Sequence, residues 1–109
     1  MDRKETLVKE LQQFAERISK VYPLKKMILF GSQATGKATK HSDVDLLLVS
    51  EKFRKQRLLQ RSPPLYLQWD LDYPVDFLCY TSEEFKKKKK QIGIVQQAVK
   101  EGVDLTAMA

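Results

Sequence analysis

Three aspartates are the residues of this chain whose type and spacing best suit metal chemistry. Asp43 and Asp45 stand at the start of an apolar run, so in a strand both would project to one face, about 6.5 Å apart along the backbone. Two carboxylates at that spacing repel each other unless a cation lies between them, and oxygen-rich sites favour magnesium, which also binds triphosphate oxygens. Asp76, an isolated acid in a later apolar run, is the best candidate for the third ligand of a two-magnesium site. Its rivals Asp70 and Asp72 lie in a less regular stretch and are expected at the surface.

A glycine–serine pair supplies the second half of the predicted site. Gly31 and Ser32 directly follow the apolar run 26–30. Glycine lets backbone N–H groups approach a phosphate without an intervening side chain, and a helix start favours anions. The hydroxyl of Ser32 can donate to the same phosphate; the alternative role for Ser32 is a helix N-cap. Combined with the acidic pair, these residues predict a site for a magnesium-bound nucleoside triphosphate.

The elements that must position these groups follow from the hydrophobic pattern. Apolar residues at spacings of three and four predict an amphipathic helix that begins near Asp2, with Glu5 completing a capping box, and ends at Tyr22–Pro23. Strands are expected over 26–30, 44–49 and 75–80. The second of these is the most apolar, which is typical of a strand covered on both faces. Between the first two strands, the small polar segment 33–42 is expected to turn at Gly36.

The second half of the chain is expected to be mainly helical. Residues 51–61 are highly charged, and Ser62 before two prolines predicts a short helix to about residue 71. Thr81 and Glu84 form a capping box, so a helix begins near residue 82; it continues, or restarts after Gly93, and Gly102 is a plausible cap at its end. This order predicts an α/β (α+β) fold, a small mixed sheet with helices mainly on one face.

Length and charge limit the possible functions. The 109 residues make one domain, 1–109, and leave no room for two, so a site that needs a second wall must take it from a homo- or hetero-oligomer. The net charge is +6, of which Lys86 to Lys90 supply five, so no broad basic stripe is expected and a nucleic-acid partner is not favoured. We expect the lysines to form a solvated helix face, with Glu83 and Glu84 four residues before Lys87 and Lys88. The alternative is an electrostatic contact with RNA or an acidic partner.

The single cysteine and the hydropathy of the chain exclude several kinds of site and of protein. Cys79 is the only cysteine, which rules out an intramolecular disulfide or a cysteine zinc cluster, and its apolar neighbours predict a core residue. The only histidine, His41, is expected in a loop. No apolar stretch reaches about 18 residues and the N-terminus is too charged for a secretory signal, so a soluble, reduced, cytoplasmic protein without membrane contact is expected. Trp69 and the tyrosines on either side of it in the sequence are expected in the core or an interface.

The motif residues resemble those of a known family. Gly31–Ser32, ten further residues and Asp43-Val44-Asp45 are similar to the signature of minimal nucleotidyltransferases in the DNA polymerase β-like superfamily. Val75-Asp76-Phe77 resembles the strand that carries the third carboxylate, and the similarity runs from about Lys26 to Leu105. One departure is Gln33-Ala34-Thr35, where many relatives have arginine at the first or third position, so the extra phosphate or acceptor contacts of those arginines are in question here.

The resemblance implies roles for these residues. Gly31 and Ser32 would bind the β- and γ-phosphates, and Asp43 and Asp45 would coordinate two magnesium ions. Asp76 would hold the catalytic ion and help to deprotonate an attacking hydroxyl, which displaces pyrophosphate. Family members of this size often pair with a helical HEPN-type toxin as its antitoxin, and some transfer AMP from ATP to a tyrosine of the toxin. The alternatives are a non-catalytic subunit that neutralises its partner by occlusion, and a nucleotidyltransferase that modifies a small molecule or an RNA end.

Overall fold

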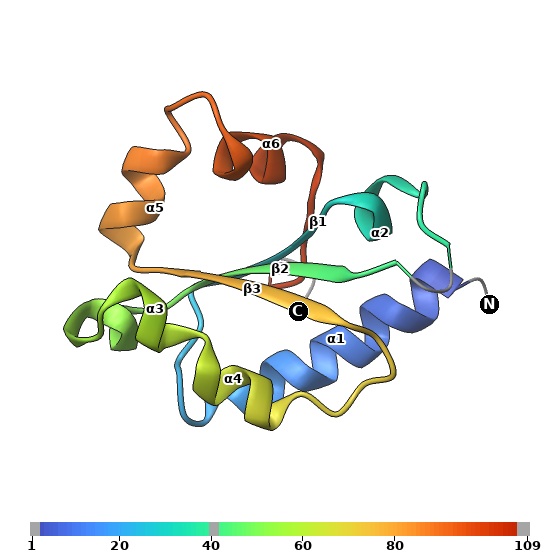
Figure 1. Ribbon diagram of the computed structural model, residues 1–109, viewed down its shortest axis with the longest axis horizontal. Coiled ribbons are helices and arrows are strands. Elements are labelled where there is room, and N and C mark those ends of the chain that lie inside the picture. Colours follow the sequence, from blue (N-terminus) through green and yellow to red (C-terminus); the bar gives the residue numbers. More distant parts are fainter. Residues whose placement is uncertain (1–2, 40–41, 107–109) are drawn as a thin grey trace.

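A four-stranded mixed sheet forms the centre of the computed structural model, which describes residues 3–39 and 42–106 (Figure 1). Its strand order is β3-β2-β1-β4. β1 (Lys26–Phe30), β2 (Val44–Val49) and β3 (Val75–Tyr80) lie where the hydrophobic pattern predicts strands. β2 pairs antiparallel with β1 and parallel with β3, and the short β4 (Val103–Asp104) pairs antiparallel with β1. The predicted mixed sheet is therefore confirmed.

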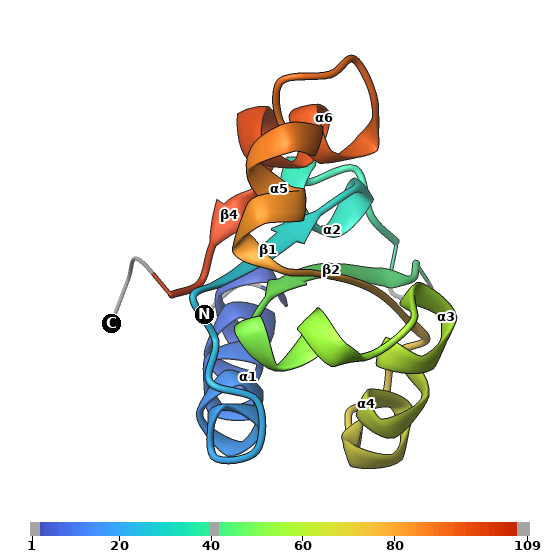
Figure 2. The ribbon, with the colours of Figure 1, turned by 90° about the vertical axis from the view of Figure 1, so that its left-hand side faces the viewer.

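Helices cover both faces of this sheet, with the larger share on one of them (Figure 2). α1 (Arg3–Ser19), α3 (Leu58–Arg61) and α4 (Pro63–Gln68) lie on one face, with the 3-10 helix η1 (Glu51–Lys55). α5 (Ser82–Lys88) and α6 (Ile94–Glu101) lie on the other. Because side chains alternate along a strand, β1 and β2 send apolar residues into both layers, which explains the unbroken apolar run of β2.

The larger core is built between α1, α4 and the sheet. Phe14 of α1 packs edge-on against Trp69, with ring centroids 5.1 Å apart, and Phe77 of β3 stacks against Phe14 at 6.0 Å. The indole Nε1 of Trp69 donates to the carbonyl oxygen of Tyr73 at 2.7 Å, so its one polar atom has a partner. The ring of Tyr66 contacts Phe77 edge-on at 5.0 Å. Trp69 and Tyr73 pack against the core as expected, whereas Tyr66 remains 43% exposed.

Several boundaries differ from the sequence expectation. The charged segment 51–61 is split, because Gln56 and Arg57 are extended between η1 and α3. This segment has helix propensity but no apolar face, so the burial of Phe53 and Arg61 decides its backbone. α4 ends at Gln68, before residue 71, and β4 was not expected because two residues are too few to show an alternation.

Other expectations about helix ends are confirmed. Thr81 and Glu84 form the predicted capping box of α5, and a new helix starts after Gly93. The N–H of Gly102 donates to the carbonyl of Ala98 at 2.8 Å and closes α6. Asp2, the expected cap of the first helix, and His41 lie outside the described residues. None of the helices in the described ranges is both long and apolar enough to cross a membrane.

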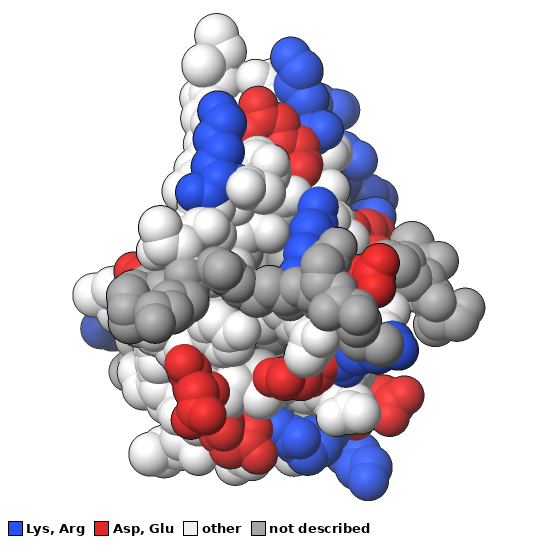
Figure 3. All heavy atoms as spheres, turned by 90° about the vertical axis from the view of Figure 1, so that its right-hand side faces the viewer, with Lys and Arg blue, Asp and Glu red and all other residues white. Residues whose placement is uncertain are grey.

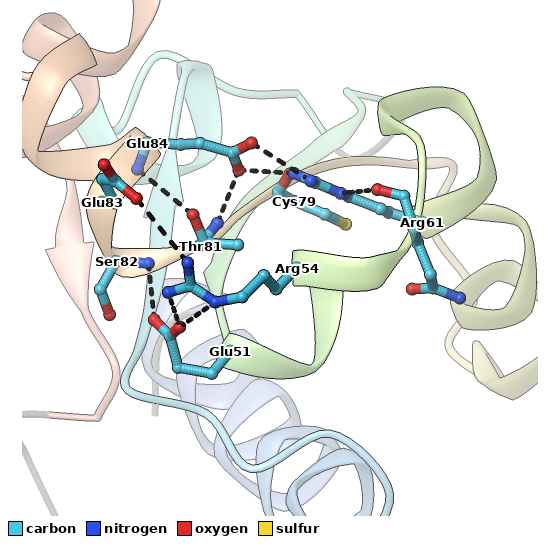
Figure 4. Close-up of polar contacts among 9 residues, drawn as sticks. Glu51, Arg54, Arg61, Cys79, Thr81, Ser82, Glu83 and Glu84 are labelled. Carbon is cyan, nitrogen blue, oxygen red and sulfur yellow. Dashed lines mark hydrogen bonds and ion pairs between the residues drawn. The ribbon is translucent and has the colours of Figure 1, made fainter.

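A buried arginine ties the two layers together at one end of β3 (Figure 4). The guanidinium of Arg61 binds both carboxylate oxygens of Glu84, at 2.6 and 3.2 Å, and donates to the backbone oxygens of Cys79 and Gln56 at 3.1 and 3.0 Å. Glu84 also accepts from the backbone N–H of Thr81 at 2.8 Å. α3 and the start of α5 are therefore held to the same strand end.

Candidate active site

Sheet register places two of the predicted carboxylates side by side. Asp45 and Asp76 are direct partners in the parallel ladder of β2 and β3, whose backbones lie about 4.8 Å apart. Asp45 alternates in step with Leu47 and Val49, which pack under α5 and α6, so its side chain is on that face of the sheet. Asp43 precedes β2 by one residue rather than lying within it. The sequence predicted all three aspartates, and the strand register shows that Asp76 lies next to Asp45.

The three carboxylates interact electrostatically. Burial raises the pKa of Asp45, and the negative charges of Asp76 and Asp43 raise it further. Within residues 3–39 and 42–106, however, no three acidic, histidine or cysteine side chains already stand at metal-binding distances. Asp43 and Asp76 are exposed, and exposed side chains change rotamer within nanoseconds, so a cation can draw them toward the half-buried Asp45. The donor set of carboxylate oxygens fits a hard cation such as magnesium.

Gly31 allows the loop after β1 to contact Asp45. Its φ of 75° and ψ of −158° fall in a region open to glycine alone, and a Cβ on it would lie 2.4 Å from Oδ2 of Asp45. Gly31 occupies the N-cap position of α2 (Ser32–Thr35), so the interpretation of Ser32 as a helix N-cap is wrong. α2 is a single turn, so it offers local N–H groups and the Ser32 hydroxyl rather than a long helix dipole.

A cavity of about 420 Å³ joins this loop to α6. That volume is within the range of about 300–1,000 Å³ usual for small-ligand sites. The predicted residues Gly31, Ser32 and Asp45 lie on its lining, whereas Asp43 and Asp76 are not among its lining residues. The remaining lining residues were not predicted from the sequence: Phe30, Thr35, Lys37, Ile94, Gln97, Ala98 and Glu101. α6 is brought here by the sheet, so no local sequence signal could have identified its residues as part of the site.

Two further side chains position the loop that leads to Asp43. Gln33 is buried, and its amide Nε2 donates to the carbonyl oxygen of Ser42 at 3.0 Å. Lys4 reaches from α1 and donates from Nζ to the carbonyl of Ala34 at 2.6 Å. Gln33 therefore holds the backbone next to the first aspartate. The polar segment 33–42 gave no sign of this burial.

The rival acids and the lone cysteine are not part of the site. Asp70 forms an exposed ion pair with Arg17 at 2.8 Å, and Asp72 lies beside it at the surface, as expected. Cys79 is buried as predicted, and burial raises the pKa of its thiol to about 12, which is incompatible with a nucleophile at neutral pH.

The lysine run is exposed as expected, but α5 ends at Lys88, so Lys89 and Lys90 lie in the following turn rather than on a helix face. Lys87 lies 3.8 Å from Glu83, but Glu84 pairs with Arg61, so the second expected helix pair gives way to the buried network.

Figure 3 faces the end of the molecule at which α2 lies, and acidic and basic side chains are interspersed there. This face therefore lacks the uniform positive charge that tracks a nucleic-acid backbone.

Comparisons with known proteins identify the family of this chain. The sequence model described as "Nucleotidyltransferase domain" matches residues 9–104. A Haemophilus influenzae protein named "Probable protein adenylyltransferase MntA" is 34% identical over 77 residues, which cover 69% of this chain and 68% of that protein. A solved Sulfolobus solfataricus structure, provisionally assigned as a nucleotidyltransferase, superposes with a TM-score of 0.66 at 20% identity, covering 93% of this chain and 80% of the other, and supports the fold. This protein is therefore an enzyme that belongs to the nucleotidyltransferase domain family, in its minimal MNT-type branch.

Proposed function

We propose that this nucleotidyltransferase transfers AMP from ATP, with magnesium, to a tyrosine hydroxyl of a HEPN-type toxin and acts as its antitoxin. The observation that carries the proposal is the pairing of Asp45 with Asp76 beside the Gly31 loop and its cavity. The similarity to a protein named an adenylyltransferase supports AMP as the transferred group. The antitoxin role and the HEPN-type partner rest on the family resemblance.

The reaction follows from where these groups lie. The loop at Gly31 and the hydroxyl of Ser32 hold the triphosphate, and Asp43, Asp45 and Asp76 would hold two magnesium ions, which neutralise charge on the attacking and leaving oxygens. Asp76 is exposed, on a strand that has β2 as its one partner in the described sheet, so a hydroxyl on another protein can approach it. Asp76 helps to remove the proton of that hydroxyl. The oxygen then bonds to the α-phosphorus, the bond to the β-phosphate breaks, and pyrophosphate leaves.

The test is transfer of label from α-³²P-ATP with magnesium to the partner protein in a lysate of the cells that make this chain. Asp43→Ala/Asp45→Ala is expected to abolish a labelled protein band. The matched control is Asp70→Ala/Asp72→Ala, which also removes two carboxylates, both away from the cavity. Label in RNA or in a small molecule would show that the acceptor is not a protein, and the assignment as a nucleotidyltransferase would stand. Equal labelling by both double variants would refute the assignment of the carboxylates.

A second candidate function is neutralisation of the partner by occlusion alone. Large apolar side chains are exposed outside the cavity, with Leu59 of α3 at 88% and Leu67 of α4 at 86% relative exposure, and occlusion by a partner would bury them. If Asp43→Ala/Asp45→Ala still neutralises the toxin at equal stoichiometry without ATP, occlusion is the better explanation. If neutralisation needs ATP and both aspartates, adenylylation is the better explanation.

A further inference from the structure

Lysines from two distant parts of the chain meet around one groove. Lys25 and Lys26, at the start of β1, line a cavity of about 280 Å³ together with Lys86 of α5 and Lys89 of the turn after it. A smaller cavity of about 120 Å³ shares Lys26 and Lys89 with it, so the two form one basic groove. The other residues of its lining are Ile28, Val49, Ser82, Phe85, Val99, Gly102 and Asp104. The basic groove shares no lining residue with the cavity beside Asp45.

The positive charge of the basic groove is only partly balanced. Nζ of Lys26 pairs with Oδ2 of Asp104 at 2.9 Å, and Asp104 is the one acid on the lining. Within residues 3–39 and 42–106, no acidic side chain forms an ion pair with Lys25, Lys86 or Lys89. Like charges gathered at one place repel each other, and a ligand that carries several negative charges would relieve this repulsion.

The acids at the start of α5 are already engaged (Figure 4). Glu51 pairs with Arg54 through one carboxylate oxygen, and its other oxygen accepts from the backbone N–H of Ser82 at 3.1 Å. The carboxylate oxygens of Glu83 lie 3.7 Å from the guanidinium of Arg54 and 3.8 Å from Nζ of Lys87. Because the N–H of Ser82 is occupied, the basic groove offers flexible ammonium groups rather than the fixed backbone donors that typically hold a phosphate.

The floor of the basic groove is apolar. Ile28, Val49 and Phe85 are buried there, and Val99 stands at the edge with 46% of its surface exposed. Nζ of Lys89 lies 5.6 Å from the centre of the Phe85 ring, and this ring is only 5% exposed, so no nucleic-acid base can stack on it. A basic rim over an apolar floor suits a protein segment that carries both carboxylates and an apolar side chain.

We propose that the basic groove docks an acidic segment of a partner protein. Carboxylates of the segment pair with Lys25, Lys86 and Lys89, and an apolar side chain between them lies against the floor. Lys26 and Phe30 are the two ends of β1, about 13 Å apart, so the docked segment leaves the nucleotide cavity beyond Phe30 open. The inference goes beyond the proposed function and does not depend on it, because the residues and the ligand are different.

Amide chemical shifts of the ¹⁵N-labelled full chain test the inference. The probe is a short peptide in which two leucines stand among glutamates. The comparison probes are the same peptide with serine in place of leucine, and a single-stranded RNA of equal charge. We expect saturable shifts at Val49, Ser82 and Phe85 with the leucine peptide, and binding weaker by about threefold or more for the serine peptide because apolar burial is lost. RNA is expected to bind more weakly than the leucine peptide.

A triple variant tests the role of the unpaired lysines. Lys25→Gln/Lys86→Gln/Lys89→Gln is expected to weaken binding of the leucine peptide about tenfold or more, since each exposed ion pair contributes up to about fivefold. These side chains are exposed, so the variant is expected to fold, which its amide spectrum shows directly. If it unfolds, Lys25→Gln/Lys86→Gln provides the same comparison with a smaller expected loss.

The matched control takes three lysines from the same run that do not line the groove. Lys87→Gln/Lys88→Gln/Lys90→Gln removes the same charge and is expected to weaken binding less than about twofold. Equal losses in the two triple variants would show that net charge, not the basic groove, attracts the peptide, and would overturn the inference. Tighter binding of RNA than of the leucine peptide, or no saturable shift at the groove, would overturn it too. None of these outcomes bears on transfer of label from ATP, which tests the proposed function separately.

Discussion

Replacement of Gly31 by alanine tests how the loop after β1 positions Asp45. Gly31→Ala imposes a conformation that non-glycine residues avoid, at a cost of about 1–3 kcal/mol. The new Cβ would also stand 2.4 Å from Oδ2 of Asp45, so the carboxylate must move by about 1 Å to reach ordinary contact at 3.4 Å. Because a misplacement of about 1 Å at a reacting centre can cost about a hundredfold in rate, the larger effect is expected on activity.

Gly36→Ala is the matched control. Gly36 also has a positive φ, 82°, but nothing lies within 4 Å of a Cβ added there. This variant should lose about 1–2 kcal/mol of unfolding free energy from backbone strain and keep most of its activity. In a domain of this size, 1 kcal/mol corresponds to about 4–8 °C in Tm, so both losses are measurable. Urea unfolding gives the free energies, and transfer of label gives the rates.

A double-mutant cycle isolates the contact between the two residues. Asp45→Ala removes the carboxylate that the new Cβ would meet. Gly31→Ala should therefore lower the free energy of unfolding by about 0.5–1 kcal/mol less in the Asp45→Ala background than in wild type. Wild-type rates in Gly31→Ala, or a cost of Gly31→Ala that is the same with and without the carboxylate, would show that Gly31 does not position Asp45.

Three further predictions concern ionisable groups. Because burial and the charges of Asp76 and Asp43 raise the pKa of Asp45, its ionised form costs stability once the pH exceeds that pKa. Asp45→Asn should therefore raise the Tm at pH 7 without magnesium. Added magnesium should raise the Tm of wild type but not that of Asp45→Asn. A lower Tm of Asp45→Asn without magnesium, or an equal rise with magnesium in both proteins, would contradict a shared cation site. The guanidinium of Arg61 holds the pKa of Glu84 below its ordinary 4.5, so this carboxylate stabilises the fold above that pH and loses the effect as the pH falls through its folded-state pKa. In that pH window, the stability of Glu84→Gln, measured by fluorescence during acid unfolding, should fall less steeply with decreasing pH than that of wild type. Identical curves would argue against the pair of Arg61 and Glu84. Burial raises the pKa of Cys79 to about 12, so iodoacetamide at pH 8 should label it in urea but not in the folded protein, as mass spectrometry would detect.

The strands and the first helix could be predicted from the sequence because their patterns are local. Alternating or continuous apolar residues set the strand ranges, and the Thr81–Glu84 capping box marked the start of α5. The split of segment 51–61 could not be predicted, since it depends on the burial of Phe53 and Arg61 against elements distant in the sequence. The same is true of β4, whose two residues are ordered by pairing with β1.

In the candidate site, too, some features could be predicted from the sequence and others only from the tertiary structure. The sequence by itself determined the motif: a glycine–serine pair after one strand, two aspartates before and within the next, and one in a third, because these depend on residue type and spacing along the chain. Only the tertiary structure decided that Asp76 is the register partner of Asp45 and that Gly31 leaves room for its carboxylate. It also decided that α6, more than sixty residues after the glycine–serine pair, supplies the opposite wall of the cavity. Strand register and helix packing are settled by contacts between segments remote in the chain, and no local pattern encodes them.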